Sequence, residues 1–234
     1  MNNSLFTQDI RAISFDLDDT LWDNRPVLKA AEQALCDWLA EHYPRIGEAY
    51  DCEALYRLRH ALYASRPDLH HDMTELRKVF LAQLALDTGY DRSLVEPAFE
   101  MFIEARHRIT LYDDVIPGLE RLRRDGYLLG ALTNGNTSIE RLGIDHLFDF
   151  SVTSEEAGAA KPEPRMFEMA CERSGIGPEG MLHVGDEPTT DIEGARRAGI
   201  RCIWMNRQNA RLETAVEPDA MVHDMQELLS LLQS

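Results

Sequence analysis

Apolar residues recur every three or four positions between residues 26 and 110, which is the spacing of amphipathic helices. The spacing predicts four helices, over about 26–42, 52–65, 74–88 and 92–110. Pro44, Pro67 and Gly89 follow the first three, and such residues are typical of helix ends. We expect most of the aromatic residues at helical spacing to form the core of this segment: Trp38, Tyr56, Phe80, Phe99 and Phe102.

A different pattern begins near residue 112, where short apolar runs alternate with amphipathic stretches. This alternation is typical of a parallel sheet covered by helices on both faces. It predicts strands at 127–132, 148–152, 181–185, 200–204 and 220–222, and helices at 119–125, 165–174, 192–198 and 225–232. The apolar run that ends at Asp16 predicts a further strand of the same sheet. We therefore expect an α/β fold, a Rossmann-like doubly wound parallel sheet formed by residues 1–21 and 112–234, with a four-helix cap domain inserted at 22–111.

The composition limits the partners. The 234 residues carry 41 acidic and 24 basic side chains, a formal charge of −17, which disfavours nucleic acid and anionic lipid as partners. No segment is long and apolar enough to predict a membrane span, and the first nine residues do not resemble a secretion signal. The four cysteines have no metal-binding spacing, so we expect free thiols in a cytoplasmic protein: Cys36, Cys52, Cys171 and Cys202.

Candidate chemistry begins where the first predicted strand ends. Asp16 and Asp18 are two residues apart, so an extended backbone points both carboxylates to the same side. Two converging carboxylates repel each other unless a cation lies between them or one is protonated. The pair therefore indicates a site for a hard metal beside a nucleophile or a proton donor.

Other polar groups follow the later strands, and in an open α/β sheet the ligand site lies at the carboxyl ends of the strands. Thr133 and Asn134 end one strand, Asp186 ends another, and Lys161 lies in a proline-rich loop. The carboxylates suit Mg²⁺, whereas a hydroxyl, backbone amides and a lysine suit a phosphoryl group. This combination predicts phosphoryl transfer, in which positioning and charge stabilisation dominate.

Taken together, these residues resemble the four motifs of the haloacid dehalogenase-like superfamily of phosphohydrolases, and the helical insertion resembles its C1-type cap. The order and spacing agree across nearly the whole chain: Asp16-Leu17-Asp18-Asp19-Thr20, then Thr133 with Asn134, then Lys161, then Gly185-Asp186 with Asp191. A receiver domain that stores phosphate also has an acidic pair, a hydroxyl and a lysine. Receivers are about half this length, lack the insertion and carry the phosphorylated aspartate on a middle strand, so we give that alternative little weight.

The resemblance implies a role for each motif residue. Asp16 would attack phosphorus, and Asp18 would protonate the leaving alcohol and then activate water. Mg²⁺ would be held by Asp16, Asp186 and the backbone carbonyl of Asp18, and Asp191 would support the metal site. Thr133, Asn134 and Lys161 would bind the phosphate. Dehalogenases of the superfamily lack the second carboxylate of the first motif, so Asp18 favours a phosphatase.

Several of these residues could instead have a purely structural role. Thr133 could only cap a helix, since Thr-Asn-Gly is typical of turns; Lys161 could be a surface lysine; and Asp191 could only cap the following helix. His183 precedes a glycine within a predicted strand, and we expect it to be a packed residue.

A closer resemblance points to a bacterial branch that dephosphorylates flavin mononucleotide and 5-amino-6-(5-phosphoribitylamino)uracil, an intermediate of riboflavin biosynthesis. It rests on residues 21–27, on His71-Asp72, and on the surroundings of Asn134 and Asp186. Trp22, Asn24, His71 and Arg77 are candidates for substrate specificity. A pyrimidine 5′-nucleotidase or a sugar phosphatase of the same superfamily remains an alternative. We expect a small phosphorylated metabolite as the substrate and a monomer or homodimer as the assembly.

Overall fold

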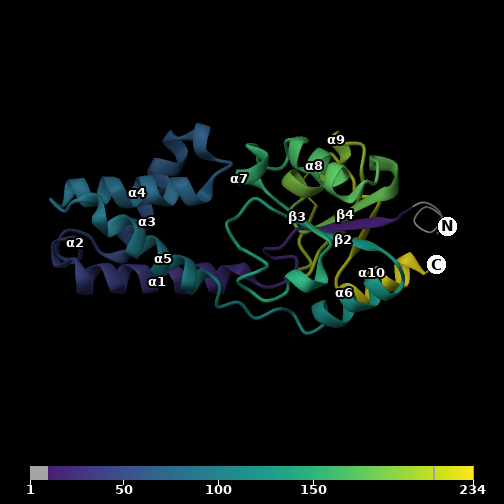
Figure 1. Cartoon of the computed structure of the whole chain (residues 1–234), viewed down its shortest axis with the longest axis horizontal. Coiled ribbons are helices and arrows are strands. Elements are labelled where there is room, and N and C mark those ends of the chain that lie inside the picture. The colour runs from purple at the N-terminus through teal and green to yellow at the C-terminus, as the bar shows by residue number, and fades with distance from the viewer. Residues whose placement is uncertain (1–9, 213, 234) are drawn as a thin grey trace. The chain divides into compact units, whose positions relative to one another are not determined.

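The computed structural model describes residues 10–212 and 214–233, which form two compact units (Figure 1). The α/β unit contains the described residues up to Asp23, the segment Thr110–Gly135 and the described residues from Leu142 onward. The helical unit contains Asn24–Ile109 and Asn136–Arg141. The amino-terminal segment in which we expect no secretion signal lies outside the described residues.

A six-stranded parallel sheet is the centre of the α/β unit, as the alternating pattern predicts. The strand order is β3-β2-β1-β4-β5-β6. Strands are added on one side of β1 up to β3 and on its other side from β4 onward, so the order of the strands switches between β1 and β4. β1 pairs with β2 on one side and with β4 on the other. The strands are β1 (Ala12–Phe15), β2 (Leu128–Thr133), β3 (Phe150–Thr153), β4 (Met181–Gly185), β5 (Arg201–Met205) and β6 (Ala220–Val222).

Helices cover both faces of this sheet, with α8 and α9 on one face and α6 and α10 on the other (Figure 1). The expected doubly wound α/β fold is therefore confirmed. The helices of this unit are α6 (Val115–Arg124), α7 (Ser154–Ala157), α8 (Arg165–Ser174), α9 (Glu193–Arg197) and α10 (Met225–Leu232). Shorter turns are the 3₁₀ segments η4 (Asp145–Leu147) and η5 (Pro178–Gly180) and the π-helical segment η6 (Pro188–Ile192).

The helical unit has five α-helices in residues 24–109, one more than the pattern predicts. The added helix is short: Pro44 begins it rather than only ending the one before, because proline fits the first turn of a helix. The helices are α1 (Asn24–His42), α2 (Pro44–Ala49), α3 (Cys52–Ser65), α4 (Met73–Asp87) and α5 (Val95–Arg106), with 3₁₀ turns η2 (Pro67–Leu69) and η3 (Arg92–Leu94).

The core of the helical unit follows the predicted spacing on α1, α4 and α5 but not on α3. Phe80 and Phe102 are buried, and Trp38 and Phe99 pack partly against the same cluster. Tyr56 is 48% exposed, so its assignment to the core is wrong. Only Leu55 is buried on α3, because that helix presents a narrow apolar face to its neighbours.

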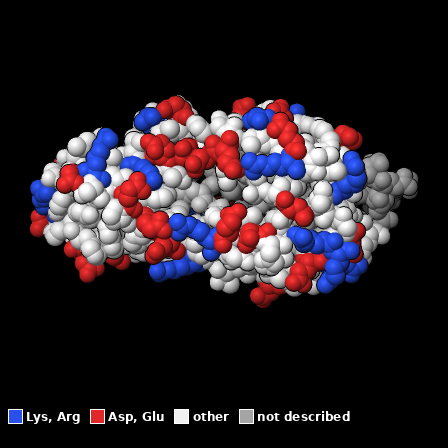
Figure 2. Space-filling view, in the orientation of Figure 1, with Lys and Arg blue, Asp and Glu red and all other residues white. Residues whose placement is uncertain are grey.

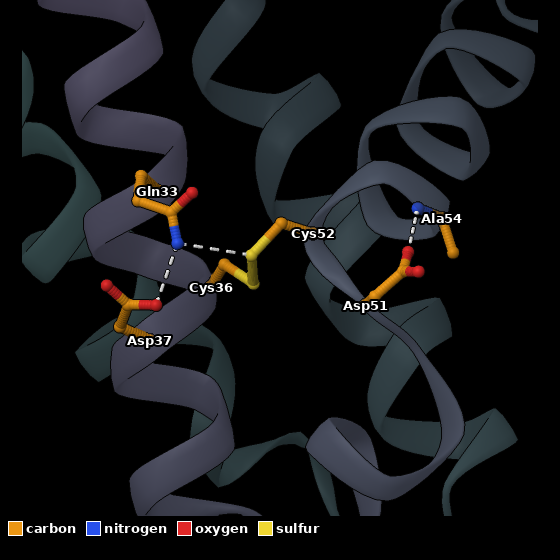
Figure 3. The surroundings of a disulfide bond; sticks show 6 residues. All are labelled: Gln33, Cys36, Asp37, Asp51, Cys52 and Ala54. Carbon is orange, nitrogen blue, oxygen red and sulfur yellow. Dashed lines mark hydrogen bonds between the residues drawn. A yellow bond between two sulfur atoms is a disulfide. The ribbon is translucent and has the colours of Figure 1, made fainter.

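The prediction of four free thiols is wrong for two of them. Cys36 on α1 and Cys52 at the start of α3 form a disulfide, with Cα atoms 5.6 Å apart (Figure 3). Gln33 donates from Nε2 to Asp37 on its own helix and to Cys52 Sγ across the helix pair. Cys171 and Cys202 are free. The sequence could not reveal the pairing, because only the packing of α1 against α3 brings together residues 16 positions apart.

Charge is dispersed over the face of the molecule drawn in Figure 2. On the face drawn in Figure 2, Lys and Arg occur in small groups among Asp and Glu rather than in one continuous basic area. None of the helices formed by residues 10–212 and 214–233 combines the length and the apolar composition needed to cross a bilayer.

Candidate active site

The candidate site begins at three neighbouring strand ends of the α/β unit. β1, β2 and β4 are adjacent and parallel, so their carboxyl ends meet at one edge of the sheet. Asp16 follows β1, Thr133 ends β2 and Asp186 follows β4. The backbone amide of Asp16 also donates to the carbonyl of Val184 on β4, at 2.9 Å, which extends the pairing to the first carboxylate. The topology therefore brings together residues more than 100 positions apart.

Lys161 joins this group from a loop and is almost fully buried, at 3% exposure. Its ammonium donates to Asp16 Oδ1 at 2.5 Å, to Asp191 Oδ1 at 2.6 Å and to the carbonyl of Leu132 at 3.1 Å. All three donor hydrogens of the ammonium are therefore used. The alternative of an ordinary surface lysine is wrong.

The side-chain amide of Asn134, predicted to bind phosphate, is hydrogen-bonded to the backbone of Lys161 in the structure. Its Oδ1 accepts from the Lys161 amide at 2.8 Å, and its Nδ2 donates to the Lys161 carbonyl at 3.0 Å. The Asn134 carbonyl in turn accepts from Ser154 Oγ at 3.1 Å. Thr133 is buried, and its hydroxyl accepts from the Gly135 amide at 2.9 Å, which leaves the hydroxyl hydrogen for another acceptor.

Asp186 is fixed by two residues for which the sequence assigns no role. Thr20 donates from its buried hydroxyl to Asp186 Oδ1 at 3.0 Å. Trp204, on β5, donates from Nε1 to the Asp186 carbonyl at 2.7 Å. Arg207 donates to the carbonyl of Thr20 at 2.8 Å and so holds the turn after β1. Thr20 is the last residue of the first motif, and its place there is the sequence feature that could have indicated this role.

Asp191 is 1% exposed and lies in the π-helical segment η6, a form of helix that is frequent at functional sites. Its Oδ2 accepts from the Glu187 amide at 3.0 Å, while Oδ1 accepts from Lys161. The carboxylate packs directly on Gly185, where a Cβ atom would lie 2.3 Å from Asp191 Cγ. Glycine at the end of β4 is therefore required by this close approach.

The buried carboxylates have strongly shifted pKa values. Burial raises the pKa of Asp16 to about 7, against the opposing attraction of Lys161. Burial and the charges of Asp16 and Asp191 raise the pKa of Asp186 to about 9. Burial would also raise the pKa of Asp191, but Lys161 and His183 outweigh it and hold this pKa well below its usual range. The single positive charge of Lys161 thus does not compensate the charges that three ionised carboxylates would carry.

These acids fit a hard divalent cation. One carboxylate oxygen from each of Asp16, Asp186 and Asp191 lies within 4.8 Å of the others. Burial is the main reason that the pKa values of Asp16 and Asp186 are raised, and the neighbouring acids add to it, so the ionised carboxylates need a cation or protons to compensate them. An all-oxygen donor set suits Mg²⁺ better than a soft metal.

Asp18, predicted to bind the metal through its backbone carbonyl, has its side chain held elsewhere. Trp22 donates from Nε1 to Asp18 Oδ1 at 3.1 Å, and the two residues also form an isolated β-bridge. Trp22 is completely buried. The structure therefore shows Trp22 in contact with Asp18, and its contact with substrate stays a prediction.

The remaining specificity candidates belong to the helical unit. Asn24 begins α1, and His71 is half-buried in the turn before α4. Arg77 is 5% exposed, donates through both terminal nitrogens to Glu32 at 2.7 and 3.0 Å, and lies 3.6 Å above the centre of the Phe102 ring. The structure thus places Arg77 in the interior of the helical unit, where it neutralises Glu32.

Comparison with known proteins agrees with this geometry. Residues 10–199 match the sequence family described as haloacid dehalogenase-like hydrolase. The chain is 33% identical over 207 residues to an Escherichia coli K12 protein named 5-amino-6-(5-phospho-D-ribitylamino)uracil phosphatase YigB, covering 87% of this chain and 86% of that protein. It is 35% identical over 209 residues to a glyceraldehyde 3-phosphate phosphatase of Methanopyrus kandleri, covering 85% and 84% of the two chains.

A solved structure is also similar over almost the full length. The crystal structure of a 2-haloacid dehalogenase from Pseudomonas syringae pv. Tomato DC3000 superimposes with a TM-score of 0.89 at 38% identity, covering 96% of this chain and 98% of the other. The family resemblance drawn from the motifs is thereby confirmed. The family match over residues 10–199, together with relatives above 30% identity that extend over most of the sequence, shows that the chain belongs to the haloacid dehalogenase-like hydrolases.

Proposed function

We propose that the protein is a Mg²⁺-dependent phosphomonoesterase that acts through a phosphoaspartyl intermediate on Asp16. The observation that carries the proposal is the buried ammonium of Lys161 between Asp16 and Asp191. A chain with a formal charge of −17 repels a phosphate at long range, so the site needs a fixed cation of its own. Lys161 supplies one, held on both sides so that it need not reorganise during the reaction.

Asp16 and Asp186 would hold Mg²⁺ with the backbone carbonyl of Asp18, and Asp191 would support them through Lys161. The bound cation would neutralise the carboxylates and the oxygens of the transferred phosphoryl group. Oδ1 of Asp16 accepts from Lys161, and Oδ2 has no hydrogen-bond partner within the described residues, which suits an attacking oxygen. Thr133 would donate its hydroxyl hydrogen to the phosphate.

Asp18 would act as general acid and base. It would protonate the leaving alcohol as Asp16 attacks phosphorus, then take a proton from the water that hydrolyses the intermediate. Trp22 would orient this carboxylate through the bond to Oδ1. We infer that Trp22 acts on the reaction through Asp18, and that Asn24 and His71 are the better candidates for contact with the substrate.

The favoured substrate is flavin mononucleotide or a ribityl phosphate of riboflavin biosynthesis. The E. coli relative, whose name specifies such a ribityl phosphate, supports this assignment. A sugar phosphatase remains the main rival, and the M. kandleri relative, named for a triose phosphate, supports it. A pyrimidine 5′-nucleotidase is the other alternative within the same chemistry.

A dehalogenase is a second candidate reaction, because the P. syringae structure carries that name at 38% identity. Displacement of halide needs no proton donor for the leaving group, whereas displacement of an alcohol does. Asp18 would be that donor, and its presence in the first motif therefore favours the phosphatase. A receiver domain, which would only store phosphate, is disfavoured by the hydrolase family match.

A panel of substrates tests the proposal. Purified protein with Mg²⁺ should release phosphate from p-nitrophenyl phosphate and fastest, by kcat/KM, from flavin mononucleotide or the ribityl phosphate. Uridine monophosphate and glyceraldehyde 3-phosphate test the two rivals, and chloride release from 2-chloropropionate tests the dehalogenase. Equal kcat/KM on all phosphates would remove the flavin assignment and leave the reaction, whereas chloride release without phosphate release would refute the phosphatase.

We place the protein in the cytoplasm as a monomer or homodimer, because phosphorylated metabolites of this size are made and consumed inside cells. The Cys36–Cys52 disulfide is the observation against this location, because such bonds are rare in a reducing cytosol. Fractionation of cells and light scattering of the purified protein test the location and the assembly.

A further inference from the structure

His183 occupies a position behind the candidate site that the predicted reaction does not use. It lies on β4, is 0% exposed, and is the register partner of Ser14 on β1. Ser14 Oγ lies 2.9 Å from His183 Nδ1, and Asp191 Oδ1 lies 3.3 Å from His183 Nε2. The ring meets Phe167 edge-on, with centroids 5.0 Å apart. From the sequence we expected packing alone, but both ring nitrogens have polar partners.

The partners fix which ring nitrogen carries hydrogen. A carboxylate is only an acceptor, so the contact with Asp191 requires a hydrogen on Nε2. In the neutral ring, which burial favours by lowering the pKa of His183, Nδ1 is then an acceptor for the Ser14 hydroxyl, which can also donate to the Leu182 carbonyl 3.4 Å away. A hydroxyl fits either tautomer, so Asp191 selects the form with hydrogen on Nε2, and Ser14 holds the ring at Nδ1.

Asp191 links this histidine to the reacting groups. Its Oδ1 accepts from both His183 and Lys161, and the Lys161 ammonium also donates to Asp16 Oδ1. A buried row of hydrogen bonds thus runs from Ser14 through His183, Asp191 and Lys161 to Asp16. His183 reaches neither Asp16 nor Asp186, the two residues proposed to hold the metal.

We propose that His183 is a positioning residue: by donating from Nε2 to Asp191 Oδ1, it orients the carboxylate that holds Lys161 against Asp16. This inference rests on the proposed phosphatase function. Partners that orient residues around a metal commonly matter about 10- to 100-fold for activity or metal affinity. The competing view is that His183 only fills space beside Phe167, and it predicts loss of stability without a specific loss of function.

Two substitutions separate these views, because each amide mimics one ring nitrogen. In His183→Gln the amide nitrogen can take the place of Nε2 and still donate to Asp191. In His183→Asn it can take only the place of Nδ1, beside Ser14, and Asp191 loses a donor. Phe167→Leu is the packing control, since it disturbs the ring contact and leaves both polar partners of His183 in place.

The readouts are the melting temperature, kcat and KM for p-nitrophenyl phosphate, and the Mg²⁺ dissociation constant measured by calorimetry without substrate. We expect His183→Asn to lower kcat or weaken Mg²⁺ binding by about 10- to 100-fold with little change in KM, and His183→Gln to stay within about 3-fold of wild type. Phe167→Leu should lower the melting temperature and leave kcat and Mg²⁺ binding unchanged. Equal functional losses in the Gln and Asn variants, or no loss in either, would overturn the proposal.

If His183→Asn does not fold, Ser14→Ala decides, because it removes only the hydroxyl that contacts His183 Nδ1 and helps hold the ring against Asp191. A loss of about 3-fold or more in kcat or Mg²⁺ affinity supports the proposal, and wild-type values contradict it. A wild-type protein that hydrolyses no phosphomonoester would refute the proposed function instead. The Mg²⁺ dissociation constants of the Gln and Asn variants would still decide the role of His183 in that case.

Discussion

The ammonium of Lys161 lies 2.5 Å from Asp16 Oδ1 in the interior of the α/β unit. The same ammonium contacts Asp191, so the lysine joins the proposed nucleophile to a carboxylate from a different strand–helix connection. Both ends of the pair are buried, and a buried charge is costly without its partner. Catalysis and stability are therefore coupled at this position.

Replacing Lys161 should affect both properties. Lys161→Ala removes a fixed positive charge beside the phosphoryl group and should lower kcat/KM by about 10²- to 10³-fold. It also leaves Asp16 and Asp191 without their counter-ion, which should cost about 3–5 kcal/mol in the free energy of unfolding. Steady-state kinetics and chemical denaturation measure the two effects. Wild-type kcat/KM in a folded Ala variant would contradict the assigned role.

The protonation of Asp16 and Asp186 predicts how Mg²⁺ stabilises the protein at different pH values. In the folded state the pKa of Asp16 is about 7 and that of Asp186 about 9, both above the ordinary aspartate value of 3.8. The cation-free native state therefore binds more protons than the unfolded chain over this range, and its stability falls as pH rises through those values. Mg²⁺ competes with these protons, so the increase in melting temperature that it causes should grow from pH 6 to pH 9.

Thermal unfolding in EDTA and in Mg²⁺ at several pH values tests that expectation. Asp186→Asn is the control, because it removes the group with the larger shift and should flatten the pH dependence of the Mg²⁺ effect. A Mg²⁺ effect that is constant with pH in the wild-type protein would show that the cation does not bind at these carboxylates.

Removing the indole donor to Asp18 should matter most for substrates with poor leaving groups. Trp22→Phe keeps the buried ring but removes the Nε1 hydrogen bond to Asp18. General acid catalysis contributes about 10²- to 10⁴-fold, and p-nitrophenolate leaves without needing a proton. We expect Asp18→Asn, and to a smaller extent Trp22→Phe, to lower kcat/KM for an alkyl phosphate far more than for p-nitrophenyl phosphate. Equal losses on both substrates would argue against Asp18 as the proton donor.

The disulfide between α1 and α3 should stabilise the helical unit. Closing a loop of this size stabilises a protein by about 3 kcal/mol in the chain-entropy account, given the separation of 16 residues. Cys36→Ser should lower the melting temperature of the oxidised protein and leave that of the reduced protein almost unchanged. Cys171→Ser is the matched control at a free cysteine. Identical melting curves of wild type and Cys36→Ser under oxidising conditions would show that the bond does not form.

The sequence predicts the α/β core well because its patterns are local. The expected bounds of β4, β6, α8 and α10 agree with the structure, and each has a clear apolar run or stripe between turn residues. The short helices α2 and α7 were missed, since six and four residues are too few to show a helical period. The sequence predicts that residues 24–109 are mostly helical, but it does not predict that they form five separate helices.

Residue types and the order of the strands predict which residues form the candidate site. They do not predict the contacts between those residues. Asp16, Thr133 and Asp186 could be brought together because parallel strands end at one edge. The use of Asn134 to hold Lys161 and the contact between His183 and Asp191 depend on side-chain packing across the sheet. Arg77 shows the same limit: the sequence makes it a candidate for substrate specificity, but helix packing pairs it with Glu32 inside the helical unit.

The most direct measurement is the rate of Mg²⁺-dependent phosphate release from p-nitrophenyl phosphate by wild type and by Asp16→Asn. The variant keeps the volume of the side chain and a hydrogen-bond acceptor for Lys161, so circular dichroism should show an unchanged fold. We expect turnover by the wild-type protein and a loss on the order of 10⁴-fold or more in the variant, because the nucleophile and one proposed metal ligand are removed. A folded Asp16→Asn protein with a substantial part of the wild-type rate would contradict the account.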